Sequence, residues 1–289
     1  MSDRLVLFPN NKTSTKVWDM LDDRSVGVLE GHTASIISAK INNDGSMAVT
    51  IAGDADDAEL YAVKIWSLGT MQSTANLMST ADEGVAILKD RLLLGSEDGP
   101  IKVWDIGGST PVALLDLDEH TDIIWSITAS DTSNVALSGS HDESVRLWDL
   151  RTGQCVRVME GQDDMVKSVS MDSTCKTAVS GSPEGVVKLW DLGSGRCSQT
   201  YKFKGYIHNV IMHESGGSFL VASGDVFFHA YSTVAGYNDH FISDVDLSSM
   251  CDSTSEHYPS VVASRDWSKV GMCCLKSADD RLLGMSVWK

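Results

Sequence analysis

The sequence lacks several features that would assign its class at once. It has no run of about 18 apolar residues, so no membrane-spanning helix is predicted. The residues after Met1 do not form the apolar core of a signal peptide. Basic residues are scarce, because 23 Lys and Arg stand against 40 Asp and Glu, which gives a net charge of −17. This balance counts against a nucleic acid or an anionic membrane as partner, since both need a concentrated basic surface.

Motifs of metal, phosphate and nucleophile chemistry are also missing. None of the six cysteines forms a Cys-x-x-Cys pair, and none has a histidine at the spacing of zinc ligands. There is no glycine-rich phosphate loop and no Gly-x-Ser-x-Gly elbow. We therefore expect no cofactor, no metal and no catalytic residue. The hydrophobic fraction of 42% is too high for a disordered acidic chain, so we expect a soluble cytoplasmic globule, with the nucleus as the alternative.

What the sequence does contain is a repeat that ends in tryptophan after a basic and an apolar residue. The tryptophans are Trp18, Trp66, Trp104, Trp148 and Trp190, at spacings of 48, 38, 44 and 42 residues. Tyr231 follows 41 residues later as a sixth anchor. Each anchor ends a short alternating stretch such as 145–148, preceded by a Gly/Ser-rich apolar run and a turn. Alternation at period two without a helical period predicts an all-β fold.

On these residues the sequence resembles the WD-repeat β-propeller family, whose blades are four-stranded antiparallel sheets of about 40–45 residues with a Gly-His…Trp-Asp signature. Gly31-His32 opens one repeat, and His120 opens another with Glu119 in place of glycine. Seven repeats of about 41 residues use the whole length. The resemblance therefore implies a single seven-bladed propeller domain over residues 1–289.

The two ends of the repeat array are the least regular. Only 17 residues precede Trp18, which leaves room for strands at 5–8 and 15–18 but not for an innermost strand. We therefore expect an incomplete first blade. Two registers fit the last blade: a third strand near 270–275 with 281–288 as the outer strand, or the segment ending at Trp288 as the seventh anchor. We favour the second register.

The resemblance also implies a buried hydrogen-bonded tetrad of histidine, strand hydroxyl, turn aspartate and tryptophan. The expected members are His32, Thr50, Asp54 and Trp66 in one repeat, and His120, Ser138 (or Ser140), Asp142 and Trp148 in another. A buried indole N–H and a buried imidazole need such partners. A Ser-His-Asp hydrolase triad is the alternative, but a nucleophile is needed once and this set recurs. Gln162, Glu184 and Tyr231 replace tetrad members elsewhere, and we expect those blades to be less stable.

Carboxylates fall mainly where the family has the loops and turns of one rim. The candidate partner-binding residues there are Asp56, Asp57, Glu59, Glu97, Asp118, Glu119, Asp163 and Asp164. A rim of one charge sign attracts opposite charge and speeds encounter. We therefore predict binding of a Lys/Arg-rich protein segment. The alternative is an acidic surface that confers solubility and has no ligand.

One segment suggests a more specific role. Trp148-Asp149-Leu150-Arg151 is similar to the box in propellers that serve as substrate receptors of cullin-type ubiquitin ligases. The resemblance would place Arg151 on the opposite rim, facing a ligase adaptor, whereas the plain alternative is an ordinary turn residue. The sequence therefore predicts a non-catalytic protein–protein interaction scaffold. A cullin-ligase receptor is the alternative and a propeller enzyme the remote one.

Overall fold

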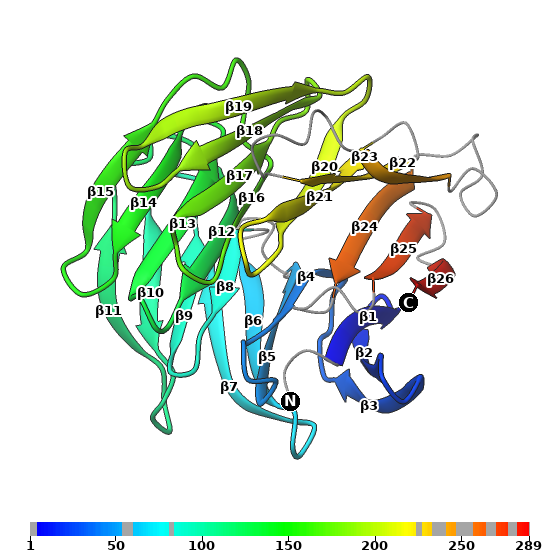
Figure 1. The fold of residues 1–289 in the computed structure, drawn as a ribbon. Coiled ribbons are helices and arrows are strands. Elements are labelled where there is room, and N and C mark those ends of the chain that lie inside the picture. Colours follow the sequence, from blue (N-terminus) through cyan, green and yellow to red (C-terminus); the bar gives the residue numbers. More distant parts are fainter. Residues whose placement is uncertain are drawn as a thin grey trace. The chain divides into compact units, whose positions relative to one another are not determined.

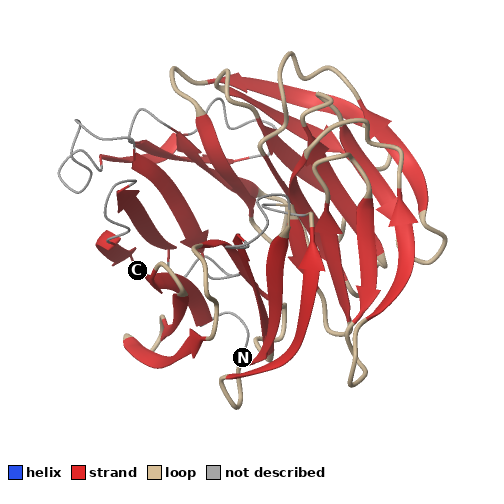
Figure 2. Cartoon of the chain, turned by 180° about the vertical axis from the view of Figure 1, so that it is seen from behind, coloured by secondary structure: helices blue, strands red, loops and turns tan. Residues whose placement is uncertain are grey.

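The computed structural model describes the backbone of residues 5–53, 60–80, 84–223, 227–232, 241–246, 257–263, 270–276 and 282–288. Every regular element in these ranges is a β-strand, and none is a helix (Figure 2). The all-β class predicted from the alternating pattern is thus confirmed. No helix capable of crossing a bilayer occurs in these ranges.

The chain divides into two compact units, Met1–Ile124 and Trp125–Lys289. The described strands of the two units make seven antiparallel sheets, five of four strands and two of three (Figure 1). These sheets are the architecture expected of a WD-repeat propeller. The prediction that residues 1–289 are one domain stays a prediction.

In the first unit, consecutive strands pair with one another in three sheets. The first sheet holds β1 (Leu5–Asn11), β2 (Ser14–Asp19) and β3 (Arg24–Glu30). The second holds β4 (Ile36–Ile41), β5 (Met47–Gly53), β6 (Tyr61–Ser67) and β7 (Gln72–Ser79). The third holds β8 (Val85–Ile87), β9 (Arg91–Gly95), β10 (Ile101–Asp105) and β11 (Val112–Leu117).

The second unit continues the same pattern in four sheets, the first of which starts at the unit boundary. It holds β12 (Ile124–Ser130), β13 (Val135–Ser140), β14 (Val145–Asp149) and β15 (Gln154–Met159). Next come β16 (Ser168–Met171), β17 (Thr177–Gly181), β18 (Val186–Asp191) and β19 (Arg196–Lys202). They are followed by β20 (Ile207–Met212), β21 (Ser218–Ser223), β22 (Phe227–Ser232) and β23 (Phe241–Asp246). The last sheet holds β24 (His257–Ala263), β25 (Val270–Lys276) and β26 (Leu282–Trp288).

The tryptophan anchors mark the same structural position in five sheets. Each lies near the end of the strand that pairs with the outer strand of its sheet, and the register of that pairing shifts at the tryptophan in every case. A recurring irregularity of this kind bends the strand and increases its twist. The sequence repeat is therefore a structural repeat.

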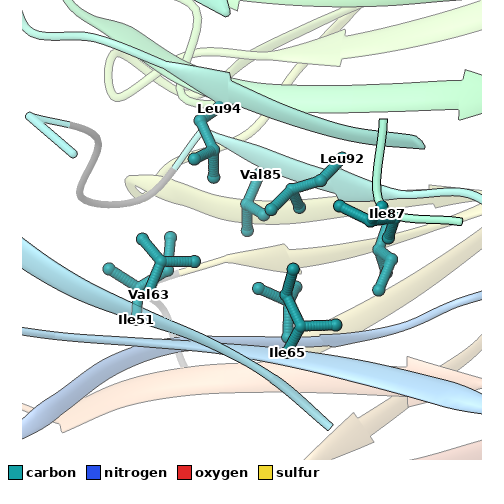
Figure 3. Close-up of a cluster of buried hydrophobic side chains, with 9 residues drawn as sticks. Ile51, Val63, Ile65, Val85, Ile87, Leu92 and Leu94 are labelled. Atoms are coloured by element: carbon teal, nitrogen blue, oxygen red, sulfur yellow. The ribbon is translucent and has the colours of Figure 1, made fainter. Parts of the chain in front are cut away.

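Apolar faces of consecutive sheets pack together within each unit. In the first unit, Ile51 and Val63 meet Leu92 and Leu94 of the next sheet (Figure 3). In the second unit, Leu137 and other residues of its sheet pack with Val169 and Ala178. The alternating side chains of each strand thus place one set between sheets, as in other layered β structures.

Glycine at the end of the second strand allows the next sheet to approach. A Cβ added to Gly139 would lie 2.5 Å from Val166, and one added to Gly181 would lie 2.6 Å from Ile207. Both distances are too short for carbon–carbon contact, so only glycine fits these positions. The Gly/Ser-rich runs seen in the sequence therefore have a packing role.

The end sheets each have three strands. The strands predicted at 5–8 and 15–18 are β1 and β2, and β3 follows them, so the first sheet is one strand short. In the last sheet, β24 lies beside β20 and β21, as β20 itself lies beside β16 and β17 (Figure 1). Strand β24 is therefore innermost, and β26 takes the third place with Trp288 at its end. This is the register that we favoured.

Candidate interaction sites

Three tryptophan indoles are tied through their N–H to a hydroxyl on the neighbouring strand. The donor–acceptor distances are 2.7 Å for Trp66 to Thr50, 2.8 Å for Trp148 to Ser138 and 2.8 Å for Trp190 to Ser180. All six side chains are almost completely buried. Leaving a buried donor unpaired costs about 1–3 kcal/mol, so these bonds matter for stability. Ser138, rather than Ser140, is the hydroxyl that serves Trp148.

His32 completes the Trp66 network. Its Nε2 lies 2.7 Å from the Thr50 hydroxyl, and the imidazole is 7% exposed. Burial, together with the nearby charge of Lys64, lowers the pKa of His32 to about 4. The ring is thus neutral at neutral pH. The fourth predicted member, Asp54, lies outside the described residues.

The second predicted tetrad is described in part. His120 is buried and belongs to the first unit, whereas its three expected partners belong to the second. Asp142 accepts hydrogen bonds from the backbone N–H and the hydroxyl of Ser144, at 3.0 and 2.6 Å. Its backbone N–H donates to the Ser140 hydroxyl. Asp142 therefore organises the β13–β14 turn, and its predicted link to the histidine stays a prediction.

A contact that we did not predict is made by Gln162. Its Nε2 donates to Ser180 at 2.6 Å, so glutamine takes the place of histidine beside the Trp190 hydroxyl. The substitution was visible in the sequence, but its ability to preserve the contact was not. The Gln162 Oε1 atom is buried and has no partner among the described residues.

A rule in the sheet register separates the tryptophans with a hydroxyl partner from those without. Each paired tryptophan faces an alanine of the second strand, and the hydroxyl stands two residues later; the alanines are Ala48, Ala136 and Ala178. Trp104 faces Leu92, with Leu94 at the hydroxyl position. Trp18 faces Val6, with Phe8 there. The indole N–H of Trp18 and that of Trp104 are buried without a partner among the described residues.

Carboxylates of the first unit gather where two segments meet. The β9–β10 turn carries Glu97 and packs against the β11–β12 connection, which carries Asp118 and Glu119. Contact is close enough that a Cβ on Gly99 would overlap the His120 carbonyl. All three carboxylates are exposed, and the Tyr61 hydroxyl donates to Glu97 at 3.2 Å. We call Glu97, Asp98, Asp118, Glu119 and Asp122 the acidic cluster.

Of the remaining predicted acidic residues, two lie on a connection of the second unit and three lie outside the described residues. In the second unit, Asp163 is exposed and Asp164 is half-buried on the β15–β16 connection. That connection meets the β13–β14 turn, since Val166 N–H donates to the Ser140 carbonyl at 2.9 Å. The candidates Asp56, Asp57 and Glu59 lie outside the described residues.

Arg151 is exposed and folds back on its own turn. Its Nε and Nη2 atoms donate to the two oxygens of Asp149, at 3.2 and 3.1 Å. These hydrogen bonds hold the pKa of the Asp149 carboxyl below its usual range. The guanidinium is therefore accessible but already forms a bidentate pair with a carboxylate.

Cys155, Cys175 and Cys197, whose side chains the structure describes, form no disulfide bond. Each lies in a strand or turn rather than in a cluster, and no group of three metal-ligating side chains occurs in the part of the chain that the structure describes. No residue set in that part therefore suggests a metal centre.

Comparison with known proteins follows the structural repeat. A family model described as "WD domain, G-beta repeat" matches residues 111–149 and 153–191, which run from β11 to β14 and from β15 to β18. WD repeat and SOCS box-containing protein 1 of Danio rerio is 44% identical over 77 residues, covering 25% of this chain and 18% of that protein.

Fungal proteins match over a longer part of the chain. Mitochondrial division protein 1 of Saccharomyces cerevisiae is 28% identical over 190 residues, covering 51% of this chain and 26% of that protein. CCR4-associated factor 4 homolog of Candida glabrata is 25% identical over 180 residues, covering 53% of this chain and 30% of that protein. The match thus spans about a quarter of the length of these relatives. From the repeated sheets, the tryptophan–hydroxyl contacts and the matching repeats, the chain is a WD-repeat protein.

Proposed function

We propose that the chain is a non-catalytic interaction scaffold, in which the seven sheets are the blades of one propeller and the acidic cluster binds a Lys/Arg-rich segment of a partner protein. WD repeats indicate protein–protein interaction, and one relative is named as a factor associated with another protein. Such a scaffold carries out no catalytic step. The chain would meet its partner protein in the cytoplasm, with the nucleus as the alternative.

The observation that carries the proposal is the junction of the β9–β10 turn with the β11–β12 connection. Carboxylate residues about 20 positions apart in the sequence lie on the two segments, which pack backbone to backbone at Gly99. Glycine is required at that point, where φ is +105°. The cluster therefore rests on a fixed scaffold rather than on a free loop.

Charge makes this surface suitable for a basic segment. Exposed ion pairs contribute about 0–1 kcal/mol each, so affinity would come from several lysines or arginines acting together. Their attraction extends over about 8 Å at physiological salt and weakens as salt rises. Binding should therefore be fast and salt-sensitive.

The test uses a fluorescent peptide of alternating lysine and serine, with a peptide of alternating glutamate and serine as reference. Anisotropy is measured from 0.05 to 0.5 M salt with the wild-type chain and with the double variant Glu97→Lys, Asp118→Lys. We expect the wild type to prefer the lysine peptide and the double variant to lose about tenfold in affinity.

The matched control is Asp22→Lys, Asp23→Lys, which makes the same charge change on the exposed β2–β3 connection. It should retain most of the affinity. Equal losses in the two variants would show that net charge alone drives binding and would overturn the proposal. Absence of a preference in the wild type would leave only the solubility role.

A second candidate is the cullin-ligase receptor. What favours it is the accessible Arg151 in the segment 148–151, together with a relative whose name combines WD repeats with a SOCS box. Affinity purification of the tagged chain should then recover a ligase adaptor, and Arg151→Ala should abolish recovery. Arg196→Ala, an exposed arginine at the start of β19, is the control. Purification of the wild type without an adaptor would remove this candidate.

A further inference from the structure

The innermost strands of the second unit are joined by serine hydroxyls. Val169 N–H of β16 donates to Ser126 of β12 at 3.1 Å. Val210 N–H of β20 donates to Ser168 of β16, also at 3.1 Å. A third bond of 2.9 Å joins Met212 N–H to Ser170. Strands β12, β16 and β20 therefore lie side by side in a fixed register (Figure 1).

This register brings three chemically distinct residues into one row. Each of them comes directly after a residue whose backbone N–H bonds to the preceding sheet. These bonds run from Ile124 to the Ser96 carbonyl, from Val166 to that of Ser140 and from Ile207 to that of Ser182. The three serines lie at the end of the second strand of their sheets or one residue beyond it. The residues of the row are Trp125, Lys167 and His208. They are thus equivalent positions of successive strands. The row lies at the ends of the strands, next to the connections that lead into them.

Direct contacts join the residues of the row in two pairs. Lys167 Nζ lies 3.4 Å from the centre of the Trp125 ring, a cation–π contact. The ring of His208 stacks on Tyr206 with centres 4.6 Å apart. Tyr206 is 37% exposed. The row therefore combines a positioned ammonium group with an accessible aromatic face.

The protonation states sharpen this description. Burial lowers the pKa of His208, and the charge of Lys167 lowers it further. Both effects disfavour the protonated form of His208, and Lys167 is the basic side chain of the row. Asp163 and Asp164 lie on the connection that leads to Lys167 and would repel a run of carboxylates.

We propose that the row Trp125–Lys167–His208–Tyr206 binds an extended protein segment with a single carboxylate between apolar side chains. The carboxylate would meet the Lys167 ammonium, and a neighbouring apolar side chain would cover the exposed face of Tyr206. A polyacidic tract would be excluded by Asp163 and Asp164. The preference is opposite in sign to that of the acidic cluster in the first unit, so this is a second binding specificity and goes beyond the proposed function.

Fluorescein-labelled nonapeptides test the proposal. They carry Leu-Glu-Phe, Leu-Gln-Phe, Leu-Lys-Phe or six consecutive glutamates between Gly-Ser flanks, and anisotropy is measured with the full chain at 0.15 M salt. We expect the Leu-Glu-Phe peptide to bind about tenfold more tightly than the other three. Equal binding of the glutamate and glutamine peptides would overturn the proposal, as would tighter binding of the lysine peptide or of the six-glutamate peptide.

Variants assign the effect to the row. Lys167→Met should remove the preference for glutamate, while Lys167→Arg should keep it within about threefold, because arginine retains the charge. Lys176→Met makes the same change at the exposed β16–β17 turn, at the other end of β16, and should have no effect. Equal weakening by the two methionine variants would overturn the proposal.

Two further measurements separate this result from other causes. Circular dichroism and thermal unfolding show whether each variant is folded, and the arginine variant provides a folded comparison in any case. The variant Glu97→Lys, Asp118→Lys should keep the preference for the Leu-Glu-Phe over the Leu-Gln-Phe peptide. A failure of the acidic cluster to bind lysine peptides would leave this result intact, so the two proposals fail separately.

Discussion

Two adjacent sheets of the first unit place different residues beside the indole N–H of their tryptophan. In the sheet β4–β7, the N–H of Trp66 and the ring of His32 share the buried hydroxyl of Thr50. In the sheet β8–β11, the equivalent position is Leu94, and the N–H of Trp104 has no partner among the described residues. Both sheets nevertheless have four strands and the same register shift at the tryptophan.

The difference shows that the polar network is not needed to form the sheet. Leu94 instead joins Val85, Ile87 and other side chains in the apolar layer between the two sheets (Figure 3). A leucine buried in this way stabilises by about 1.5–3 kcal/mol, which offsets the cost of one unpaired indole N–H. The hydroxyl network and the apolar contact are thus alternative solutions of similar value.

The largest effect is expected from Thr50→Val. Valine has nearly the same shape as threonine but leaves both the Trp66 N–H and the His32 ring without their partner. Each unpaired buried group costs about 1–3 kcal/mol, so the free energy of unfolding should fall by about 2–4 kcal/mol. Urea denaturation followed by tryptophan fluorescence measures it.

Thr152→Val is the control for this prediction, since Thr152 is exposed in the turn after β14. Its effect should stay within about 0.5 kcal/mol. Two variants of equal stability would mean that the Thr50 network contributes nothing, and the contrast between the two sheets would disappear.

The next largest effect is the pH dependence of the free energy of unfolding that His32 causes through the sheet β4–β7. Its pKa of about 4 in the folded chain lies below the ordinary value of 6.5. Between these values the unfolded chain takes up a proton that the folded chain does not. Stability is therefore lost as pH falls from 6.5 to 4, by up to about 3 kcal/mol.

His32→Gln removes the titrating group and places there the residue that the Trp190 sheet uses. Chemical denaturation at pH 7 and at pH 4.5 should show a loss of stability that is smaller by about 2 kcal/mol in the variant than in the wild type. His141→Gln, at an exposed turn position, should keep the wild-type slope. The same slope in all three proteins would contradict a buried neutral histidine.

A smaller effect should distinguish the two tryptophans themselves. Trp66→Phe removes apolar surface and a hydrogen bond, whereas Trp104→Phe removes apolar surface and an unpaired N–H. We expect Trp66→Phe to be more destabilising by about 1 kcal/mol. Urea denaturation of both variants checks the order, and the reverse order would show that Trp104 has an acceptor in solution.

The smallest change is expected from Gln162→His. The variant removes the buried amide oxygen that has no partner in the described residues and offers a ring nitrogen to Ser180. The free energy of unfolding should rise by about 0.5–1 kcal/mol at pH 8. This gain should disappear at pH 5, because the unfolded chain protonates the histidine whereas the folded chain buries it neutral. Thermal unfolding at the two pH values measures it, and a gain that persists at pH 5 would contradict this account.

The repeat made the architecture predictable. The Trp anchors and the alternating stretches located the middle strand β2 of the first sheet and the third strand of the four-stranded sheets, and the register of the last sheet follows the anchor at Trp288. The contact of Trp66 with Thr50, and that of Trp148 with Ser138 or Ser140, were implied by the family resemblance, in which buried donors find acceptors.

Other features depend on contacts that spacing does not encode. The role of Gln162 depends on how far a side chain reaches, and the row from Trp125 to Tyr206 depends on the register between sheets that follow one another in the chain. The pattern of an alanine followed two residues later by Ser or Thr would have identified the paired tryptophans in advance. The comparison between sheets revealed that pattern only once the strand pairing was known.

The serine bonds between β12, β16 and β20 have a consequence for how the second unit opens. The backbone N–H groups of Val169, Val210 and Met212 are held by side chains of a neighbouring sheet. Their exchange with deuterium therefore reports the separation of two sheets rather than the fraying of one. Slow exchange at these three amides would mean that neighbouring repeats open together, so that the unit behaves as a cooperative array in which each repeat carries part of the stability of the next.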